Sequence, residues 1–133
     1  MGIFNNIFGG KEEKTSKVEK KSFLNWIPLT TLEQLEEIKE QSKTESILIF
    51  KHSIRCGISS MVIKRFEGLF TEDHQNLKVY YLDLLNHRNI SDEVGYSFQV
   101  MHQSPQLLVI KNGVSIHNES HYDILETTLT RFI

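Results

Sequence analysis

The segment ILIFKHSIRCGIS, at residues 47–59, decides the fold of this chain. Its first four residues form a continuous apolar run bounded by polar residues, which is typical of a central strand buried on both faces. After a polar loop, apolar residues recur at helical spacing and predict a helix at about residues 59–70: Ile58, Val62, Phe66, Leu69 and Phe70. The loop between strand and helix contains Cys56, the single cysteine of the chain.

Strand and helix patterns alternate on both sides of this unit. Residues 27–29 and 77–83 have the composition of short β-strands, and residues 32–42 have the apolar periodicity of a helix. Ser91 is the predicted N-cap of a further short helix at residues 92–98. Such alternation is the pattern of an α/β domain.

The last third of the chain predicts a β-hairpin followed by a helix. Two β-rich runs, residues 107–111 and 114–117, are separated only by Asn112-Gly113, which favours a type I′ turn. An apolar stripe after Ser120 then predicts a terminal helix: Tyr122, Leu125, Leu129 and Phe132. The predicted order is β-α-β-α-β-α-β-β-α, with a central mixed sheet flanked by helices.

Composition excludes several classes of protein. The chain has 133 residues, and 15 lysines and arginines against 17 acidic residues offer nucleic acid no basic surface. A single cysteine cannot form an internal disulfide or a cysteine-based zinc site, and the histidine spacing does not favour a metal site. Without a signal peptide or a long apolar span, we expect a soluble, cytoplasmic protein with no membrane span.

Residues 1–22 differ in composition from the rest of the chain. Residues 11–21 hold five lysines and three glutamates in a polar run, so we expect a flexible N-terminal arm at 1–22 and one domain at 23–133. Four apolar residues of the arm have helical spacing: Ile3, Phe4, Ile7 and Phe8. They leave open a weak peripheral contact with a membrane or a partner, and the simpler alternative is a terminus without a role.

Cys56 lies where a helix is expected to begin, and this position favours a reactive thiolate. The first turn of a helix presents unpaired N–H groups and the positive end of the helix dipole. Arg55, Lys51 and a protonated His52 would add positive charge near the same sulfur. The alternative is a cysteine that serves only as a small buried apolar residue.

The motif around Cys56 resembles that of the thioredoxin superfamily. Cys56-Gly57-Ile58-Ser59 stands at a strand-to-helix junction, and Ser104-Pro105 precedes the Asn-Gly hairpin. The resemblance covers the chain from about residue 27 to its C-terminus. It implies a thioredoxin-like fold, a cis peptide bond before Pro105, and a main chain at Ser104 that aligns an extended substrate by strand-like hydrogen bonds.

Within that superfamily, the segment His52-Ser53-x-Arg55-Cys56-x-x-Ser59 resembles the YtxJ-type bacillithiol-system redox-active proteins, the monothiol bacilliredoxins. Arg55 stands where thioredoxins have tryptophan, and Ser59 stands where they have the second cysteine. A dithiol enzyme clears its mixed disulfide with that second thiol, whereas a serine there requires an external thiol. A dithiol reductase is therefore excluded.

The resemblance implies a monothiol thiol–disulfide oxidoreductase with Cys56 as its catalytic residue. Its substrates would be S-thiolated client proteins, from which it removes a low-molecular-weight thiol. That thiol would be a co-substrate rather than a bound cofactor, with bacillithiol implied by the family and glutathione able to follow the same chemistry.

Residues next to Cys56 are candidates for thiol activation and substrate positioning. Ser59 could donate a hydrogen bond to the thiolate, cap the helix, or be an ordinary serine at a helix start. Arg55 could stabilise the thiolate and bind carboxylates of the small thiol, or be a solvated surface charge. Gly57 belongs to the motif, and His52 could aid proton transfer, although packing against the loop is favoured.

The loop before Pro105 adds a second group of candidates. His102, Gln103 and Ser104 precede the proline directly and are expected to border the site.

Two functions of another class stay open. Monothiol glutaredoxins carry a C-G-F-S motif, and C-G-I-S at residues 56–59 differs from it by one apolar residue. In that case Cys56 and the small thiol would ligate an iron–sulfur cluster between two subunits. The other alternative is a non-catalytic thioredoxin-fold redox sensor or adaptor, whose Cys56 is modified and recognised by a partner.

Overall fold

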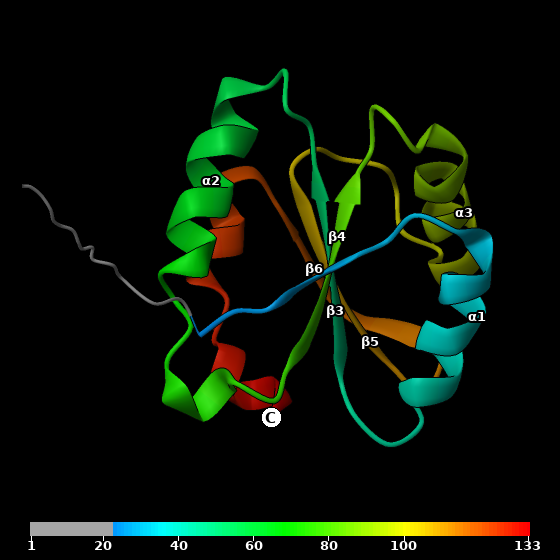
Figure 1. Cartoon of the computed structure of the whole chain (residues 1–133), viewed down its shortest axis with the longest axis horizontal. Coiled ribbons are helices and arrows are strands. Elements are labelled where there is room, and N and C mark those ends of the chain that lie inside the picture. The colour runs from blue at the N-terminus through cyan, green and yellow to red at the C-terminus, as the bar shows by residue number, and fades with distance from the viewer. Residues whose placement is uncertain (1–22) are drawn as a thin grey trace, which may run out of the picture.

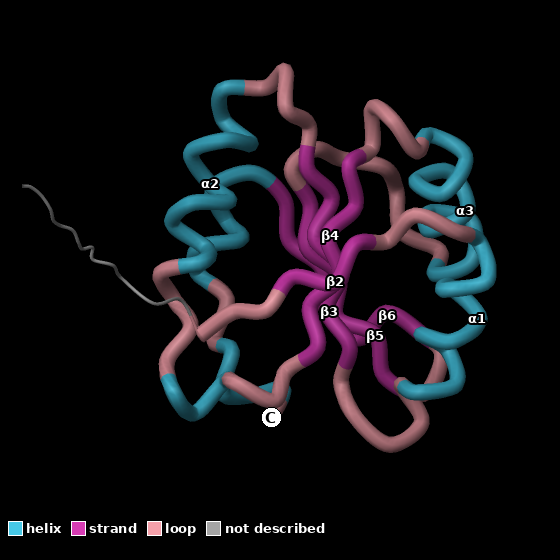
Figure 2. Tube along the Cα trace, viewed as in Figure 1, coloured by secondary structure: helices cyan, strands magenta, loops and turns pink. Residues whose placement is uncertain are grey.

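A computed structural model of the chain describes residues 23–133. Figures 1 and 2 show a central sheet with helices on both faces. The predicted arm and its four apolar residues lie outside the described residues. Within residues 23–133, no helix is long and apolar enough to cross a membrane.

The sheet has five strands in the order β2-β4-β3-β5-β6. β4 pairs in parallel with β2 and β3, and β5 pairs antiparallel with β3 and β6. The sheet is therefore mixed, as predicted. The strands are β2 (Trp26–Pro28), β3 (Ile47–His52), β4 (Lys78–Asp83), β5 (Gln106–Lys111) and β6 (Val114–Ser120).

The helices divide between the two faces of the sheet. Figure 1 shows α2 (Gly57–Glu67) and the C-terminal segments on one face, and α1 (Leu32–Gln41) and α3 (Arg88–Phe98) on the other. Thr31 starts α1 with a capping box, in which the Thr31 Oγ1 accepts the Gln34 N–H and the Gln34 side chain accepts the Thr31 N–H.

β3 contributes side chains to two separate apolar cores, one on each face of the sheet. All six of its residues are buried. Because side chains alternate along a strand, Leu48 and Phe50 pack on the α2 side, and Ile47 and Ile49 pack on the side of α1 and α3.

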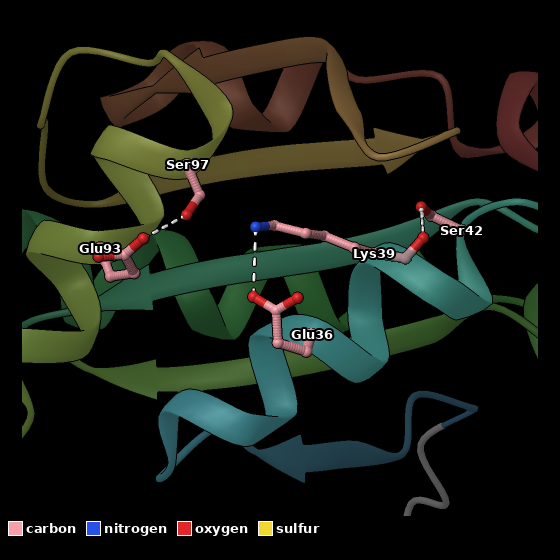
Figure 3. A network of polar contacts seen from close by, with 5 residues as sticks. All are labelled: Glu36, Lys39, Ser42, Glu93 and Ser97. Atoms are coloured by element: carbon pink, nitrogen blue, oxygen red, sulfur yellow. Dashed lines mark hydrogen bonds and ion pairs between the residues drawn. The ribbon is translucent and has the colours of Figure 1, made fainter.

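The Asn-Gly hairpin is confirmed. Asn112 and Gly113 have φ angles of 55° and 78°, as a type I′ turn requires. Ser42, at the end of α1, holds this turn from outside: its carbonyl oxygen accepts the Asn112 N–H at 2.7 Å, and its Oγ accepts the Gly113 N–H at 2.8 Å. The hydroxyl itself donates to the Lys39 carbonyl oxygen at 2.7 Å, as Figure 3 shows.

Two helix predictions were wrong at their boundaries. Ser91 does not cap a helix, because α3 begins a turn earlier at Arg88 with His87 as its N-cap, and Ser91 is buried within α3. The helix expected at residues 59–70 begins at Gly57 and ends at Glu67, so Ile58 lies in its first turn and is 40% exposed.

The predicted terminal helix is replaced by two 3₁₀ helices, η3 (His121–Glu126) and η4 (Leu129–Phe132). Thr127 and Thr128, both β-branched and extended, separate them. The change of period leaves Tyr122 exposed and buries Ile124. A third short 3₁₀ helix, η2 (Glu72–His74), lies between α2 and β4.

Ser42→Ala is expected to lower the free energy of unfolding by about 1–2 kcal/mol, because it leaves the Gly113 N–H without its acceptor. Urea unfolding followed by circular dichroism measures the change. Thr44→Ala removes an exposed hydroxyl bonded to the Gln41 carbonyl and serves as the control, with an expected change below about 0.5 kcal/mol. Equal effects of the two substitutions would contradict the anchoring role of Ser42.

Candidate functional site

Cys56 lies between the end of β3 and the start of α2. Its N–H donates to the Ser53 carbonyl oxygen at 3.1 Å, and its carbonyl oxygen accepts the Ser60 N–H at 3.0 Å. The residue is therefore the N-cap of α2, but its side chain makes no capping hydrogen bond. The thiol is free and half-buried, so solvent and a substrate sulfur can reach it at the positive end of the helix.

Both neighbours of Cys56 in the sequence are exposed. Arg55 takes part in no hydrogen bond or ion pair with another residue of the described part, so its guanidinium is available to a ligand. At Gly57, an added Cβ would meet nothing within 4 Å. The surface beside the sulfur is thus open on both sides.

The Ser104–Pro105 peptide bond is cis. Lys51 of β3 pairs with Gln106 of β5, so the loop before Gln106 lies at the same edge of the sheet as the loop that carries Cys56. Within residues 23–133, the Oγ of Ser104 is buried without a hydrogen-bond partner, and the Ser104 main chain also has none. The main-chain groups of Ser104 are therefore unpaired in the described part of the chain.

The Ser59 hydroxyl is already engaged. Its Oγ lies 2.7 Å from the Nδ1 of His52 and accepts the Ser53 N–H at 3.1 Å. Among the described residues, its hydrogen bonds therefore run to His52 and Ser53 and not to Cys56. Ser59 is buried, and it connects the start of α2 to the end of β3.

His52 is 6% exposed, and its ring lies 5.7 Å from that of Tyr81. Burial lowers the pKa of His52, although the negative charge of Asp83 opposes this shift. The lowered pKa favours the neutral imidazole, which is contrary to the expectation that a protonated His52 adds positive charge near the sulfur.

Lys51 also differs from the expectation that it adds charge beside Cys56. Its side chain is fully buried on the α1 and α3 side of the sheet, where its Nζ lies 2.7 Å from the Nδ1 of His102. The contact between Lys51 and His102 was missed in the sequence, where the only signal was a lysine inside a buried strand.

Exposed apolar side chains adjoin the thiol. Ile54 and Ile58, two residues before and after Cys56, are both exposed, as is Met61 one turn further along α2. The Tyr122 hydroxyl of η3 lies 3.9 Å from the Met61 sulfur. Within residues 23–133, no group of three or more histidine, cysteine or acidic residues could hold a metal ion.

Comparison with protein families gives the chain its class. The profile of the family described as monothiol bacilliredoxin BrxC matches residues 27–129, most of the chain. The chain belongs to this family. Membership of the bacilliredoxin family and similarity to an oxidoreductase with a thioredoxin fold both indicate redox activity as the general function of this chain.

Solved structures support the same fold. A structure described as a candidate oxidoreductase with a thioredoxin fold is 28% identical, with a TM-score of 0.68 over 80% of this chain and 91% of that chain. The thioredoxin of Malassezia sympodialis is 18% identical, with a TM-score of 0.68 over 90% of this chain and 98% of that one. A thioredoxin of Schistosoma mansoni is 20% identical, with a TM-score of 0.62 over 83% of this chain and 100% of that one.

Protonation of His52 makes the free energy of unfolding depend on pH. Its pKa in the folded state lies below the ordinary value of 6.5, so the unfolded chain binds more protons as the pH falls through 6.5. The free energy of unfolding is expected to fall between about pH 7 and about pH 5, and His52→Asn should make that fall shallower. Urea unfolding across this pH range measures it.

The matched control is His121→Asn, because His121 is exposed and has a φ angle of 57°, which asparagine tolerates. This control should keep the full pH dependence of the parent chain. An equal flattening in both variants would contradict the role of His52.

Proposed function

We propose that this chain is a monothiol thiol–disulfide oxidoreductase that removes a low-molecular-weight thiol from modified protein cysteines through Cys56. One observation carries the proposal: a half-buried thiol stands at the start of α2, and the residue three positions on is a buried serine. The resemblance to thioredoxins aligns this serine with their second cysteine. Such a site can form a mixed disulfide but cannot resolve it internally.

The first step exchanges one disulfide for another. The Cys56 thiolate attacks the small thiol's sulfur in the substrate's mixed disulfide and forms a new S–S bond with it. The original S–S bond breaks, and the protein cysteine leaves as a thiolate that takes a proton from solvent. The client is thereby reduced, and Cys56 carries the small thiol.

The second step needs an external molecule of the small thiol. Its thiolate attacks the small thiol's sulfur on Cys56, and the Cys56 thiolate is released together with a symmetric disulfide of the small thiol. Over the two steps, one protein mixed disulfide and one small thiol become one protein thiol and one small disulfide. Client and small thiol balance without another oxidant or reductant.

Residues around the thiol would position the two substrates. The free main-chain groups of Ser104 suit a client segment in extended conformation, and the exposed Ile54 and Ile58 suit its apolar side chains. Arg55 would bind a carboxylate of the small thiol, because its guanidinium is exposed and unpaired within the described part of the chain. Family membership supports bacillithiol as that thiol, with glutathione as the alternative.

Transfer of the small thiol tests the proposal directly. We expect intact-mass spectrometry to show the small thiol moving from a bacillithiolated or glutathionylated model protein to Cys56, and free thiol to regenerate the enzyme. Cys56→Ala should accept nothing. If Cys56 stays unmodified with both donors, the catalytic proposal fails, and visible absorbance after anaerobic iron–sulfur reconstitution would favour the cluster-binding alternative.

Ser59→Cys is expected to create an internal resolving thiol, because residue 59 follows Cys56 by three positions at the start of α2. Mild oxidation should then give an internal disulfide, detected as the loss of two hydrogens by mass spectrometry. Ser60→Cys, at the adjacent exposed position, is the control and should form none. A failure of the Ser59 variant to form the bond while it remains folded would contradict this placement of Ser59.

A further inference from the structure

Lys51 is a buried cation that forms no ion pair in the described part of the chain. It is 0% exposed, and no ion pair among residues 23–133 includes it. Burial lowers its pKa to about 8, opposed by the charge of Asp92 on α3, so Lys51 remains mainly protonated at neutral pH. Among the described residues, the one hydrogen bond of its side chain runs to His102 Nδ1 at 2.7 Å. Burying a charge in this way is unfavourable for folding, so stability does not explain the presence of Lys51. A role in function is indicated instead.

Gln106 lies directly opposite Lys51 in the β3–β5 pair and is 1% exposed. Its Nε2 donates to the Met101 carbonyl oxygen at 2.9 Å, and its Oε1 accepts the Gln103 N–H at 3.4 Å. Directly paired residues of two strands send their side chains to the same face. Two buried polar side chains therefore hold the loop at residues 101–104 from one place in the sheet.

This loop has no other polar attachment in the described part of the chain. Every hydrogen bond that residues 101–104 form within residues 23–133 runs to Lys51 or Gln106. Met101 is 82% exposed and His102 is exposed, so packing adds little. The last residue of the loop, Ser104, offers the main-chain groups that the proposed client segment would use.

The protonation state of His102 decides whether this contact holds. A lysine ammonium can only donate, so His102 Nδ1 must accept and its proton must lie on Nε2. Three charges face His102: Lys51 from β3, and Arg88 and Asp92 from α3. Burial and the two cations lower the pKa of His102, and Asp92 raises it. Protonation would remove the acceptor and place two cations in contact.

We propose that Lys51, acting through His102, is a positioning residue that holds the cis-proline loop in the conformation that binds the client protein. Protonation of His102 releases this hold. The inference rests on the proposed function for its kinetic consequences, but the position of the loop can be measured without turnover.

Lys51→Met tests the inference, because methionine keeps the approximate shape of the buried chain and removes the donor. We expect the KM for the S-thiolated model protein to rise about tenfold, as for the loss of one charge-assisted hydrogen bond. The kcat and the rate of Cys56 alkylation by iodoacetamide should stay unchanged. The urea midpoint should stay equal or rise, since a buried charge is removed. Lys111→Met, at the far end of β5, should leave all four quantities unchanged.

His102→Asn provides a conservative rescue. Its amide oxygen can accept from the Lys51 ammonium but does not titrate, whereas His102→Leu removes the acceptor. The KM of the parent chain should rise as the pH falls through the pKa of His102, which lies below the ordinary value of 6.5. The asparagine variant should keep a low KM without this rise, and the leucine variant should have a high KM at all pH values.

Two results would overturn the inference. One is an unchanged KM in Lys51→Met, with unchanged amide NMR shifts at residues 101–105. The other is a loss of stability accompanied by equal losses in alkylation rate and turnover, which would show a purely structural role. If the parent chain does not turn over either S-thiolated protein, the proposed function fails by itself. The amide shifts of Lys51→Met and His102→Leu then decide the inference alone.

Discussion

The burial of β3 on both faces is the constraint on which the rest of the structure depends. All six residues of this strand are buried, and the last two, Lys51 and His52, are polar. Because water cannot solvate these two side chains, each needs a polar partner inside the protein. The strand's alternation sends them to opposite sides of the sheet. His52 reaches the Ser59 hydroxyl at the start of α2, and Lys51 reaches His102 in the loop before the cis-proline. One strand thereby anchors both segments that form the candidate site.

This arrangement separates two tasks around one sulfur. The contact between His52 and Ser59 joins the strand to the first turn of α2, which sets where the thiol stands. Lys51 and Gln106 hold the loop that would set where a substrate chain lies. The two sets of contacts share no residue and lie on different faces of the sheet. If the proposed function holds, a change in one set would alter the reactivity of the thiol, while the other set would continue to position the client.

Local patterns were sufficient to predict most of the fold from the sequence. The apolar run at residues 47–50, the helical periodicity after Cys56 and the Asn112-Gly113 turn each depend on neighbouring residues alone. The terminal helix was predicted wrongly because the periods of 3₁₀ and α-helices differ little over a few residues. In the structure, Thr127 and Thr128 divide this segment into η3 and η4. The start of α3 was misplaced because His87 caps it without a side-chain hydrogen bond.

For the candidate site, the motif located the cysteine and the cis-proline, but not the polar contacts that support them. The pairing of Lys51 with His102 joins residues 51 positions apart, and its existence depends on the register of β3 against β5. No local pattern encodes that register. The neutral state of His52 likewise follows from burial by distant parts of the chain, so its charge could not be read from the residues beside it.

Gly57 shows how such a site can diversify. Open space surrounds the position where its side chain would begin, and its backbone is that of an ordinary first helical residue. Larger residues can therefore be accepted directly beside the sulfur without repacking of either core. Proline, whose fixed φ suits the first position of a helix, is among them. The residue after the cysteine is thus a place where natural variation or protein engineering can alter the chemistry of the thiol and leave the scaffold intact.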